Sequence, residues 1–269
     1  MAVEMRCPIC KSEARLFRYF KATPILWCTD PKCGFRFFDL SKWESPYSEA
    51  DYYANWEPHP IAFLNPWIQA RVNIVKRFKK SGKIAELGCG IGETAVALDR
   101  AGYEVVGVED SEKAINFLRK EFPTTEWRNE NLLKFLENNP RAFDVATMFH
   151  VLEHIPDPRR VVKLIDASLR HGGTIVIEVP DVSGGFARLK GEKWDYYLDH
   201  HVNYFDVKSL RKLFGLFGYS LKFLEKTYHF SHPQGSLIKD IVKGGLARLG
   251  MNSIIRTVWE KPVSRNGVG

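Results

Sequence analysis

The stretch Glu86-Leu87-Gly88-Cys89-Gly90-Ile91-Gly92 decides the fold of this chain. It ends an apolar run over residues 83–87 and precedes a run with helical character over residues 93–98. A strand that enters a glycine-rich turn and continues as a helix is a nucleotide-binding device. The glycines let the backbone approach a ligand, and the helix end offers unpaired N–H groups. We therefore predict a nucleotide-binding site at this turn.

The spacing of the glycines narrows the class of ligand that this turn can bind. A dinucleotide fold requires G-x-G-x-x-G, with a pyrophosphate on the helix end. Here Gly88, Gly90 and Gly92 give G-x-G-x-G, and Glu86 lies two residues before the first glycine. A carboxylate at that position repels a pyrophosphate but suits a ligand that carries an ammonium group. The pattern therefore argues against a dehydrogenase.

A second acid follows at a suitable distance. Glu109 lies 17 residues beyond Gly92 and ends the apolar run over residues 104–108. An acid about 20 residues after the loop can accept hydrogen bonds from ribose hydroxyls. The alternative is that Glu109 or Asp110 only caps the helix predicted over residues 112–121. Both can hold together, since Asp110 or Ser111 can cap that helix while Glu109 binds the ribose.

The glycine loop and Glu109 together resemble the first motifs of class I S-adenosylmethionine (SAM)-dependent methyltransferases. Two further stretches fit that resemblance: the predicted strand 143–149 followed by Leu152-Glu153-His154-Ile155-Pro156-Asp157-Pro158, and the strand 171–180 after a Gly-Gly turn. The resemblance covers about residues 80–225. It implies an α/β fold with a doubly wound, Rossmann-like sheet, and SAM as cofactor. The cofactor-binding positions it implies are Glu86, Gly88, Gly90, Gly92, Glu109 and Asn129.

Asn129 is a departure from this family pattern. Family members usually carry Asp at the end of the third strand, where it meets the adenine amino group. The amide oxygen of Asn129 can accept the same hydrogen bond.

Four of the five cysteines fall within the first 33 residues, as Cys7, Cys10, Cys28 and Cys33. Two close pairs separated by a hairpin-length insert can place four thiolates in a tetrahedron around zinc. Such a closed site makes the metal structural, since no coordination position is left open. Redox use and four buried structural thiols are the alternatives. Cys89, inside the glycine loop, is expected to pack as a small side chain.

These motifs divide the chain into four parts: a zinc ribbon over residues 1–45, a connector and leading helix over 46–80, the SAM-binding domain over 81–230, and a basic C-terminal extension over 231–269, expected to be a helical tail. The ribbon should contain a hairpin and a third short strand near residues 35–38. A ribbon, a tyrosine-containing connector and then this domain resemble bacterial and archaeal methyltransferases that modify sugars and other small metabolites. Tyr47, Tyr52 and Tyr53 would then line the active-site entrance or pack against the helix over 61–80.

Candidate catalytic residues lie in the insert after the fifth strand. The string His200-His201-Val202-Asn203-Tyr204-Phe205 resembles an E-H-x-x-Y-F motif of the sugar-modifying group. That resemblance places His201 on the general base and Tyr204 beside it, with His200 where the family often has Glu. An imidazole suits proton abstraction at neutral pH. The alternative is that His201 only holds the backbone of the insert. His150, after the fourth strand, could face the methyl donor.

The composition of the chain limits its possible class, location and binding partners. The 269 residues are 45% hydrophobic, which is ample for a core, and carry a net charge of +7. No run of about 18 uncharged apolar residues predicts a membrane span, and a cytoplasmic protein is expected. Residues 221–269 hold eight basic and three acidic residues. That excess could meet phosphate groups on nucleic acid, lipid or a nucleotide-linked substrate, or form a solvated helix face.

Two functions follow from these observations. The favoured one is a SAM-dependent methyltransferase acting on a small molecule, such as a sugar. The alternative is an RNA-directed methyltransferase that uses the ribbon and the basic tail for binding. The sequence does not name the acceptor atom or the oligomeric state.

Overall fold

A computed structural model describes residues 5–43, 65–228, 245 and 250–262. The connector tyrosines Tyr47, Tyr52 and Tyr53, the start of the helix expected from residue 61, and the helix expected over 236–249 lie outside the described residues, apart from residue 245. None of the described helices combines the length and the apolar character that crossing a membrane requires.

Seven strands form the larger sheet, in the order β10-β11-β8-β7-β4-β5-β6. Their bounds are β4 Lys83–Leu87, β5 Glu104–Glu109, β6 Glu126–Asn129, β7 Phe143–Phe149, β8 Leu169–Pro180, β10 Ser220–Thr227 and β11 Ile254–Glu260. β4 pairs in parallel with both β5 and β7. The chain order therefore reverses at β4, and in doubly wound sheets ligands bind beyond the carboxyl ends of the strands at this reversal. The predicted fold class is confirmed.

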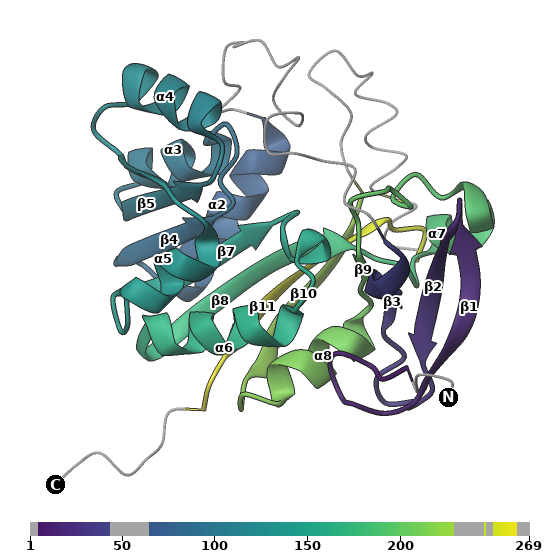
Figure 1. Ribbon diagram of the computed structural model, residues 1–269. Coiled ribbons are helices and arrows are strands. Elements are labelled where there is room, and N and C mark those ends of the chain that lie inside the picture. The colour runs from purple at the N-terminus through teal and green to yellow at the C-terminus, as the bar shows by residue number, and fades with distance from the viewer. Residues whose placement is uncertain (1–4, 44–64, 229–244, 246–249, 263–269) are drawn as a thin grey trace, which may run out of the picture. The chain divides into compact units, whose positions relative to one another are not determined.

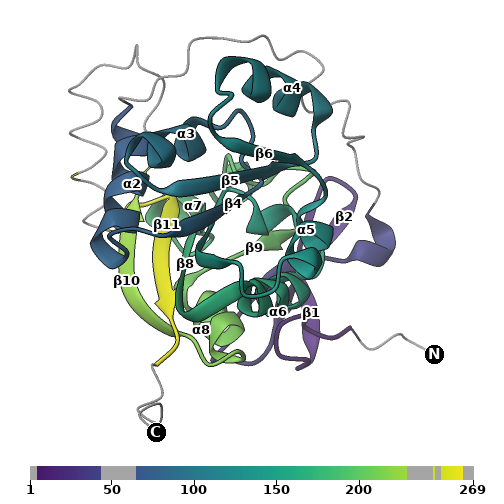
Figure 2. The ribbon, with the colours of Figure 1, turned by 90° about the vertical axis from the view of Figure 1, so that its left-hand side faces the viewer.

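The helices of this part follow the strands in alternation. They are α2 Pro66–Phe78, α3 Glu93–Arg100, α4 Glu112–Glu121, α5 Leu132–Asn138, α6 Pro158–Ser168 and α8 Val207–Gly215. Figure 2 shows β4, β5 and β6 side by side, with α3 and α4 above them. Caps fix several helix starts: Ser111 accepts from Ala114 N, and Asp206 forms a capping box with Ser209. Such caps satisfy backbone donors that the helix leaves open.

Four shorter strands form a second sheet, in the order β1-β2-β3-β9 (Figure 1). Their bounds are β1 Ala14–Phe20, β2 Thr23–Cys28, β3 Arg36–Phe38 and β9 Asn203–Tyr204. The hairpin and the third strand expected for the ribbon are confirmed. The pairing of β3 with β9 was not predicted. It joins the ribbon to the insert that carries the candidate catalytic residues.

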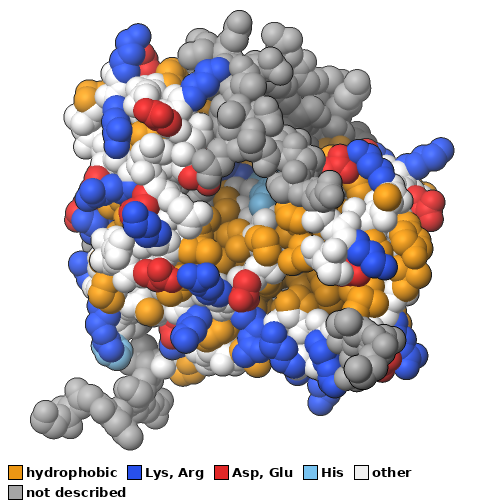
Figure 3. Space-filling model, viewed as in Figure 1, with side chains coloured by type: hydrophobic (Ala, Val, Ile, Leu, Met, Phe, Trp, Pro, Cys, Tyr) orange, Lys and Arg blue, Asp and Glu red, His pale blue; other side chains and the backbone are white. Residues whose placement is uncertain are grey.

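The insert after β8 contains a short helix, α7 Gly185–Lys190, and packs its aromatic side chains against the ribbon sheet. We call this packing the ribbon–lid cluster; its buried members are Ile25, Phe38, Val182, Ala187, Trp194, Tyr197, Val202 and Tyr204. Figure 3 shows that hydrophobic side chains also gather on the outer surface over β1 and β2. On these two strands, Leu16, Tyr19 and Trp27 are 49%, 59% and 40% exposed.

Contacts divide the chain into two compact units. The first comprises residues 1–46, 150–162 and 178–257, and the second residues 47–149, 163–177 and 258–269. The ribbon thus shares a unit with the insert, whereas the glycine loop belongs to the other unit.

The expectation of a helical C-terminal extension is wrong for residues 254–260. They form β11, which lies between β10 and β8 in the larger sheet. Every residue from Ile254 to Trp259 is buried, because the β-branched and aromatic side chains suit a central strand. Arg256 is only 1% exposed and pairs with Glu178 and Glu225. Its charge is therefore not available to a nucleic acid or lipid.

Candidate active site

The glycine loop forms a tight turn between β4 and α3. Gly88, Gly90 and Gly92 all have positive φ, of 68°, 56° and 76°. A Cβ on Gly92 would lie 2.5 Å from a Leu118 side-chain carbon and 2.9 Å from Trp127. Both the backbone conformation and the space therefore require glycine at that position. Cys89 is buried, consistent with the packing role expected for it.

Glu86, near the end of β4, has an unusual environment. Its side chain is 4% exposed, and its Oε2 has no hydrogen-bond partner in the described part of the chain. Burial raises the pKa of this carboxyl to about 8, although the charge of Arg71 opposes that shift. A buried carboxylate oxygen without a donor is costly on its own. A bound ammonium group would supply the missing donors and charge, so Glu86 fits the amino group of SAM.

Glu109 ends β5 and reaches back to the loop. Its Oε2 accepts from Gly90 N at 3.0 Å, and its Oε1 accepts from Asp110 N and Ser111 N, each at 3.1 Å. Burial raises the pKa of Glu109 to about 7. The carboxylate is thus held against the loop at the carboxyl end of β5, where the ribose is expected. Ser111 caps α4, so capping and ribose binding need not compete for one residue.

Asn129 ends β6 and lies opposite Glu109 in the β5–β6 register. Its amide nitrogen donates to the carbonyls of Glu109 and Asp110, at 3.2 and 2.8 Å. Both contacts use the nitrogen, which leaves the amide oxygen as the group that could accept from an adenine amino group. Glu86, Glu109 and Asn129 therefore all lie at the carboxyl ends of neighbouring strands.

The four ribbon cysteines lie together. Their sulfurs are all within 4.8 Å of one another, with Cys7 Sγ 3.8 Å from Cys33 Sγ and Cys10 Sγ 3.3 Å from Cys28 Sγ. All four are free thiols. Backbone N–H groups of Ile9 and Cys10 reach the sulfur of Cys7. A hydrogen bond from Cys33 lowers the pKa of Cys7 to about 6, whereas burial raises that of Cys28 to about 12. The four sulfurs converge closely enough to bind a zinc ion, which prefers a tetrahedron of thiolates with Zn–S bonds of about 2.3 Å.

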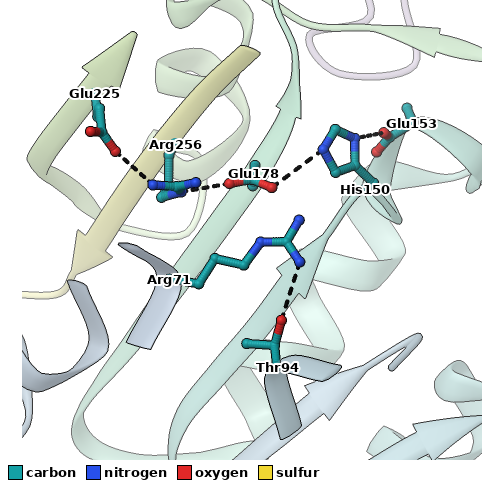
Figure 4. Close-up of polar contacts among 7 residues, drawn as sticks. All are labelled: Arg71, Thr94, His150, Glu153, Glu178, Glu225 and Arg256. Carbon is teal, nitrogen blue, oxygen red and sulfur yellow. Dashed lines mark hydrogen bonds and ion pairs between the residues drawn. The ribbon is translucent and has the colours of Figure 1, made fainter. Parts of the chain in front are cut away.

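His150 lies in a chain of charges with two buried carboxylates, and its own side chain is 23% exposed (Figure 4). Its Nδ1 is 3.2 Å from Glu153 Oε1 and its Nε2 is 3.3 Å from Glu178 Oε1. Burial alone would lower the pKa of His150, but these two carboxylates raise it to about 9. His150 is therefore a cation at neutral pH and is not a ready base. On the other side, Glu178 pairs with Arg256.

The backbone at His150 is also constrained. Its φ is 59°, which is uncommon for a residue with a Cβ. Its N–H donates to the carbonyl of Glu178 at 2.9 Å, which ties the residue to β8 directly after β7 ends. Such strained residues concentrate at functional sites.

His154, His200 and His201 form a compact group. Their ring nitrogens lie within 4.8 Å of one another, a spacing that could also hold a metal ion. His201 is 5% exposed, and its Nδ1 is 2.9 Å from the carbonyl of Tyr196. With Nδ1 donating there, Nε2 is the acceptor nitrogen of a neutral ring. Burial lowers the pKa of His201 to about 3, while the negative charge of Glu153 opposes that shift.

The remaining catalytic candidates lie nearby in the same unit. Burial lowers the pKa of His200, and the ring of His200 lies 5.0 Å from that of His201. Tyr204 is 2% exposed and packs in the ribbon–lid cluster, 5.0 Å from the ring of Tyr197. Sequence reasoning did not single out Glu178 or Arg256. Glu178 is an acid inside the apolar run of β8, two residues before the strand ends, a signal that could have identified it.

Comparison with known proteins identifies the family to which this chain belongs. A family described as "Methyltransferase domain" matches residues 62–222. A ubiquinone biosynthesis O-methyltransferase of Actinobacillus pleuropneumoniae serotype 7 is 30% identical over 136 residues, covering 45% of this chain and 56% of that protein. The corresponding enzyme of Pseudomonas fluorescens SBW25 is 28% identical over 124 residues, covering 43% and 51%. The chain thus spans about half the length of these curated relatives.

Solved structures agree on the fold. A SAM-dependent methyltransferase from Mesorhizobium loti matches with a TM-score of 0.56 and 17% identity, covering 74% of this chain and all of that one. One from Archaeoglobus fulgidus matches with a TM-score of 0.53 and 17% identity, covering 72% and 94%. The chain belongs to the methyltransferase-domain family and has the fold of SAM-dependent methyltransferases.

Proposed function

We propose that this member of the methyltransferase-domain family transfers a methyl group from SAM to a small-molecule acceptor, such as a sugar or a nucleotide-linked sugar. The single observation that carries the cofactor is Glu86, a buried carboxylate with an oxygen that lacks a donor, placed immediately before the glycine loop. The names of the ubiquinone-biosynthesis relatives support an acceptor that is a small molecule.

The residues of the second unit would hold the cofactor. Glu86 would pair with the ammonium group, the backbone of Gly88 to Gly92 would line the amino-acid part, Glu109 would accept from the ribose hydroxyls, and Asn129 would face the adenine. SAM, when bound, supplies an activated methyl group. The protein then has to position the acceptor and remove its proton.

We assign proton removal to His201. Its Nε2 is the acceptor nitrogen, its orientation is fixed by the Tyr196 carbonyl, and the negative charge of Glu153 partly offsets the burial that disfavours the imidazolium. His200 and Tyr204 would support its position. His150 keeps Glu153 ionised, because burial raises the pKa of that carboxyl but the hydrogen bond from His150 lowers it further. His150 thus acts through Glu153 rather than as a base.

The four cysteines would hold a structural zinc ion. Because β3 pairs with β9, the metal would support the insert that carries His201 as well as the ribbon itself.

The experiment that tests this function is transfer of labelled methyl from SAM into a fractionated extract. Label in small polar metabolites supports the proposal, whereas label confined to RNA or protein contradicts the acceptor class. The Glu109→Ala variant is the matched control, since at limiting SAM its transfer should fall together with its weakened SAM binding.

A further inference from the structure

Three histidines of the first compact unit, His154, His200 and His201, form a group that the proposed methyl transfer uses only in part. Their ring nitrogens lie within 4.8 Å of one another. The centroid of the His154 ring lies 5.1 Å from that of His200 and 4.8 Å from that of His201. Three protein ligands, often imidazoles, bind zinc at sites that keep a fourth position open to water. The group therefore has the composition and the spacing of a metal site with three ligands.

Two of the three rings are already oriented for metal binding. The Nδ1 of His154 is 3.1 Å from the carbonyl of His200, and the Nδ1 of His201 is 2.9 Å from the carbonyl of Tyr196. A carbonyl oxygen can only accept, so each Nδ1 carries the proton and each Nε2 offers a lone pair. Histidines that bind metals nearly always donate their other N–H in this way, which fixes the tautomer and the ring. The protein thus presents two Nε2 ligands in the form that a metal requires.

The backbone segments that carry the histidines are tied to each other. His154 ends the short 3₁₀ helix η2 Leu152–His154, whereas the other two histidines come from the insert just before β9. Asn203, in β9, is 3% exposed, and its amide nitrogen donates to the carbonyl of Ile155 at 2.6 Å. This buried hydrogen bond joins the insert to the residue that follows η2. The three rings are therefore held on two segments that the fold fixes against each other.

The electrostatic environment of the group favours a metal cation. Burial lowers the pKa of His200, and lowers that of His201 to about 3, so both rings are neutral at neutral pH and need not lose a proton to bind metal. Glu153 is 1% exposed, and its negative charge acts on both His154 and His201. Its Oε1 lies 3.2 Å from His150 Nδ1, but its Oε2 is buried without a hydrogen-bond partner among the described residues. This carboxylate would stabilise a divalent cation beside the rings.

We propose that His154, His200 and His201 bind zinc or a similar divalent transition metal, and that this metal switches methyl transfer off. Imidazole nitrogens suit zinc, copper and nickel, whereas magnesium prefers oxygen ligands. The effect on turnover rests on the proposed function, in which Nε2 of His201 accepts the proton of the methyl acceptor. A metal bound at that nitrogen occupies its lone pair, so the proton cannot be accepted there. His154 and His200 are only partly buried, which suits an ion that exchanges with solvent.

The binding test is a titration of the full chain whose four-cysteine site already holds zinc. Calorimetry with added Zn²⁺ should show a second, weaker ion per chain, and Mg²⁺ should show none. His154→Gln and His200→Gln should each weaken the second ion about tenfold or more, since even an outer contact of a metal site is worth about 10- to 100-fold in affinity. His171→Gln removes an exposed histidine of β8 and is the matched control, so it should bind as the parent does.

Cobalt(II) identifies the ligands independently of affinity. Bound by three imidazoles, it should give a visible absorption band without the charge-transfer band that thiolate ligands produce. Turnover is then measured on each chain with and without added zinc. Zinc should stop transfer by the parent and by His171→Gln, and dialysis should restore it. His154→Gln should retain more of its own metal-free turnover than the parent does at the same zinc concentration.

SAM affinity and the thermal midpoint, measured without added metal, show whether each variant is folded. Absence of a second zinc ion in the parent would overturn the proposal, as would binding that neither His154→Gln nor His200→Gln weakens. A thiolate charge-transfer band would place the cobalt in the ribbon and contradict the histidine site. A second ion that leaves turnover unchanged would contradict the switch. Failure of SAM to bind would instead contradict the proposed function, while the metal titration would still be readable.

Discussion

The glycine loop and the ribbon–lid cluster have opposite imbalances of buried polar groups. Around the loop, carboxylates are in excess: Glu86 has an oxygen without a donor, and burial raises the pKa of both Glu86 and Glu109. Around the cluster, donors are in excess, with Arg18 and Arg36 lacking carboxylate partners among the described residues. An excess of acceptors at the loop suits a cationic ligand, whereas the donors of the cluster are enclosed in its side-chain packing.

The chain of charges through His150 shows the contrasting case. Glu178 lies between Arg256 and His150, and His150 lies between Glu178 and Glu153. Each of these charges has a partner of opposite sign, so the charge of this network is balanced within the protein. The comparison teaches that buried charge alone does not indicate a binding site; an unbalanced carboxylate at the glycine loop does.

Removing metal should have the largest effect and should separate the two regions. We expect one zinc per chain in protein prepared without chelator. Chelation should disorder the ribbon and, through the β3–β9 pairing, the insert, so turnover should be lost. SAM affinity should persist, because the glycine loop belongs to the other compact unit. Elemental analysis, turnover and calorimetry measure the three quantities.

Two variants control the metal experiment. Cys7→Ser should lose zinc, whereas Cys89→Ala should retain it, because Cys89 lies in the glycine loop. Metal-free parent protein with full turnover would contradict the assignment. Zinc that remains after Cys7→Ser would indicate that the group of His154, His200 and His201 binds metal as well.

Substitution of the base should have the next largest effect. His201→Ala should lower turnover about 10²- to 10⁴-fold with little change in SAM affinity. An imidazole with its ordinary pKa of about 6.5 would give a rise in rate near that pH, but burial lowers the pKa of His201 to about 3. The imidazole is then unprotonated throughout the usual assay range, so the parent rate should show no such limb between pH 5 and 8. His200→Ala should be milder.

This prediction fails if the His201 variant keeps parental turnover. A limb near pH 6.5 that disappears in His201→Ala would show instead that acceptor binding restores an ordinary imidazole pKa.

The balanced network predicts a dependence of stability on pH. Because the folded-state pKa of His150 is raised from 6.5 to about 9, its contribution is fully present below pH 6.5 and is lost as the pH rises to about 9. The contribution is on the order of 3 kcal/mol. Urea denaturation of the parent and of His150→Gln at pH 6 and pH 9 measures it. The variant should lose much of the difference between the two pH values; an equal difference would place its source elsewhere, as in Glu86.

The smallest effect concerns one carboxylate of the loop. Glu109→Ala should weaken SAM binding at least tenfold, since it removes charge-assisted hydrogen bonds to the ribose. Calorimetry measures the affinity. Glu112→Ala, at the exposed start of α4, is a matched control and should bind as the parent does. Parental affinity in Glu109→Ala would remove this residue from the site.

The sequence by itself determined the local features of this protein. The glycine loop, the acid that ends the second strand, the paired cysteines and the Ser111 cap were readable because each depends on residues close together along the chain. Glycine spacing and cap residues have strong local preferences that tertiary structure does not override. The strands and helices around the predicted SAM site follow the same logic.

Tertiary structure decided the arrangements that join distant segments. Arg256 counted as a tail charge in the sequence, but β11 carries it into the centre of the sheet, where Glu178 pairs with it. The strand β9 has only two residues and so shows no recognisable sequence pattern, which is why its pairing with β3 could not be predicted. Likewise, His150 became a cation and His201 a neutral ring because of the groups packed around each of them. Burial and long-range pairing set these properties, and neither is encoded within a short window of sequence.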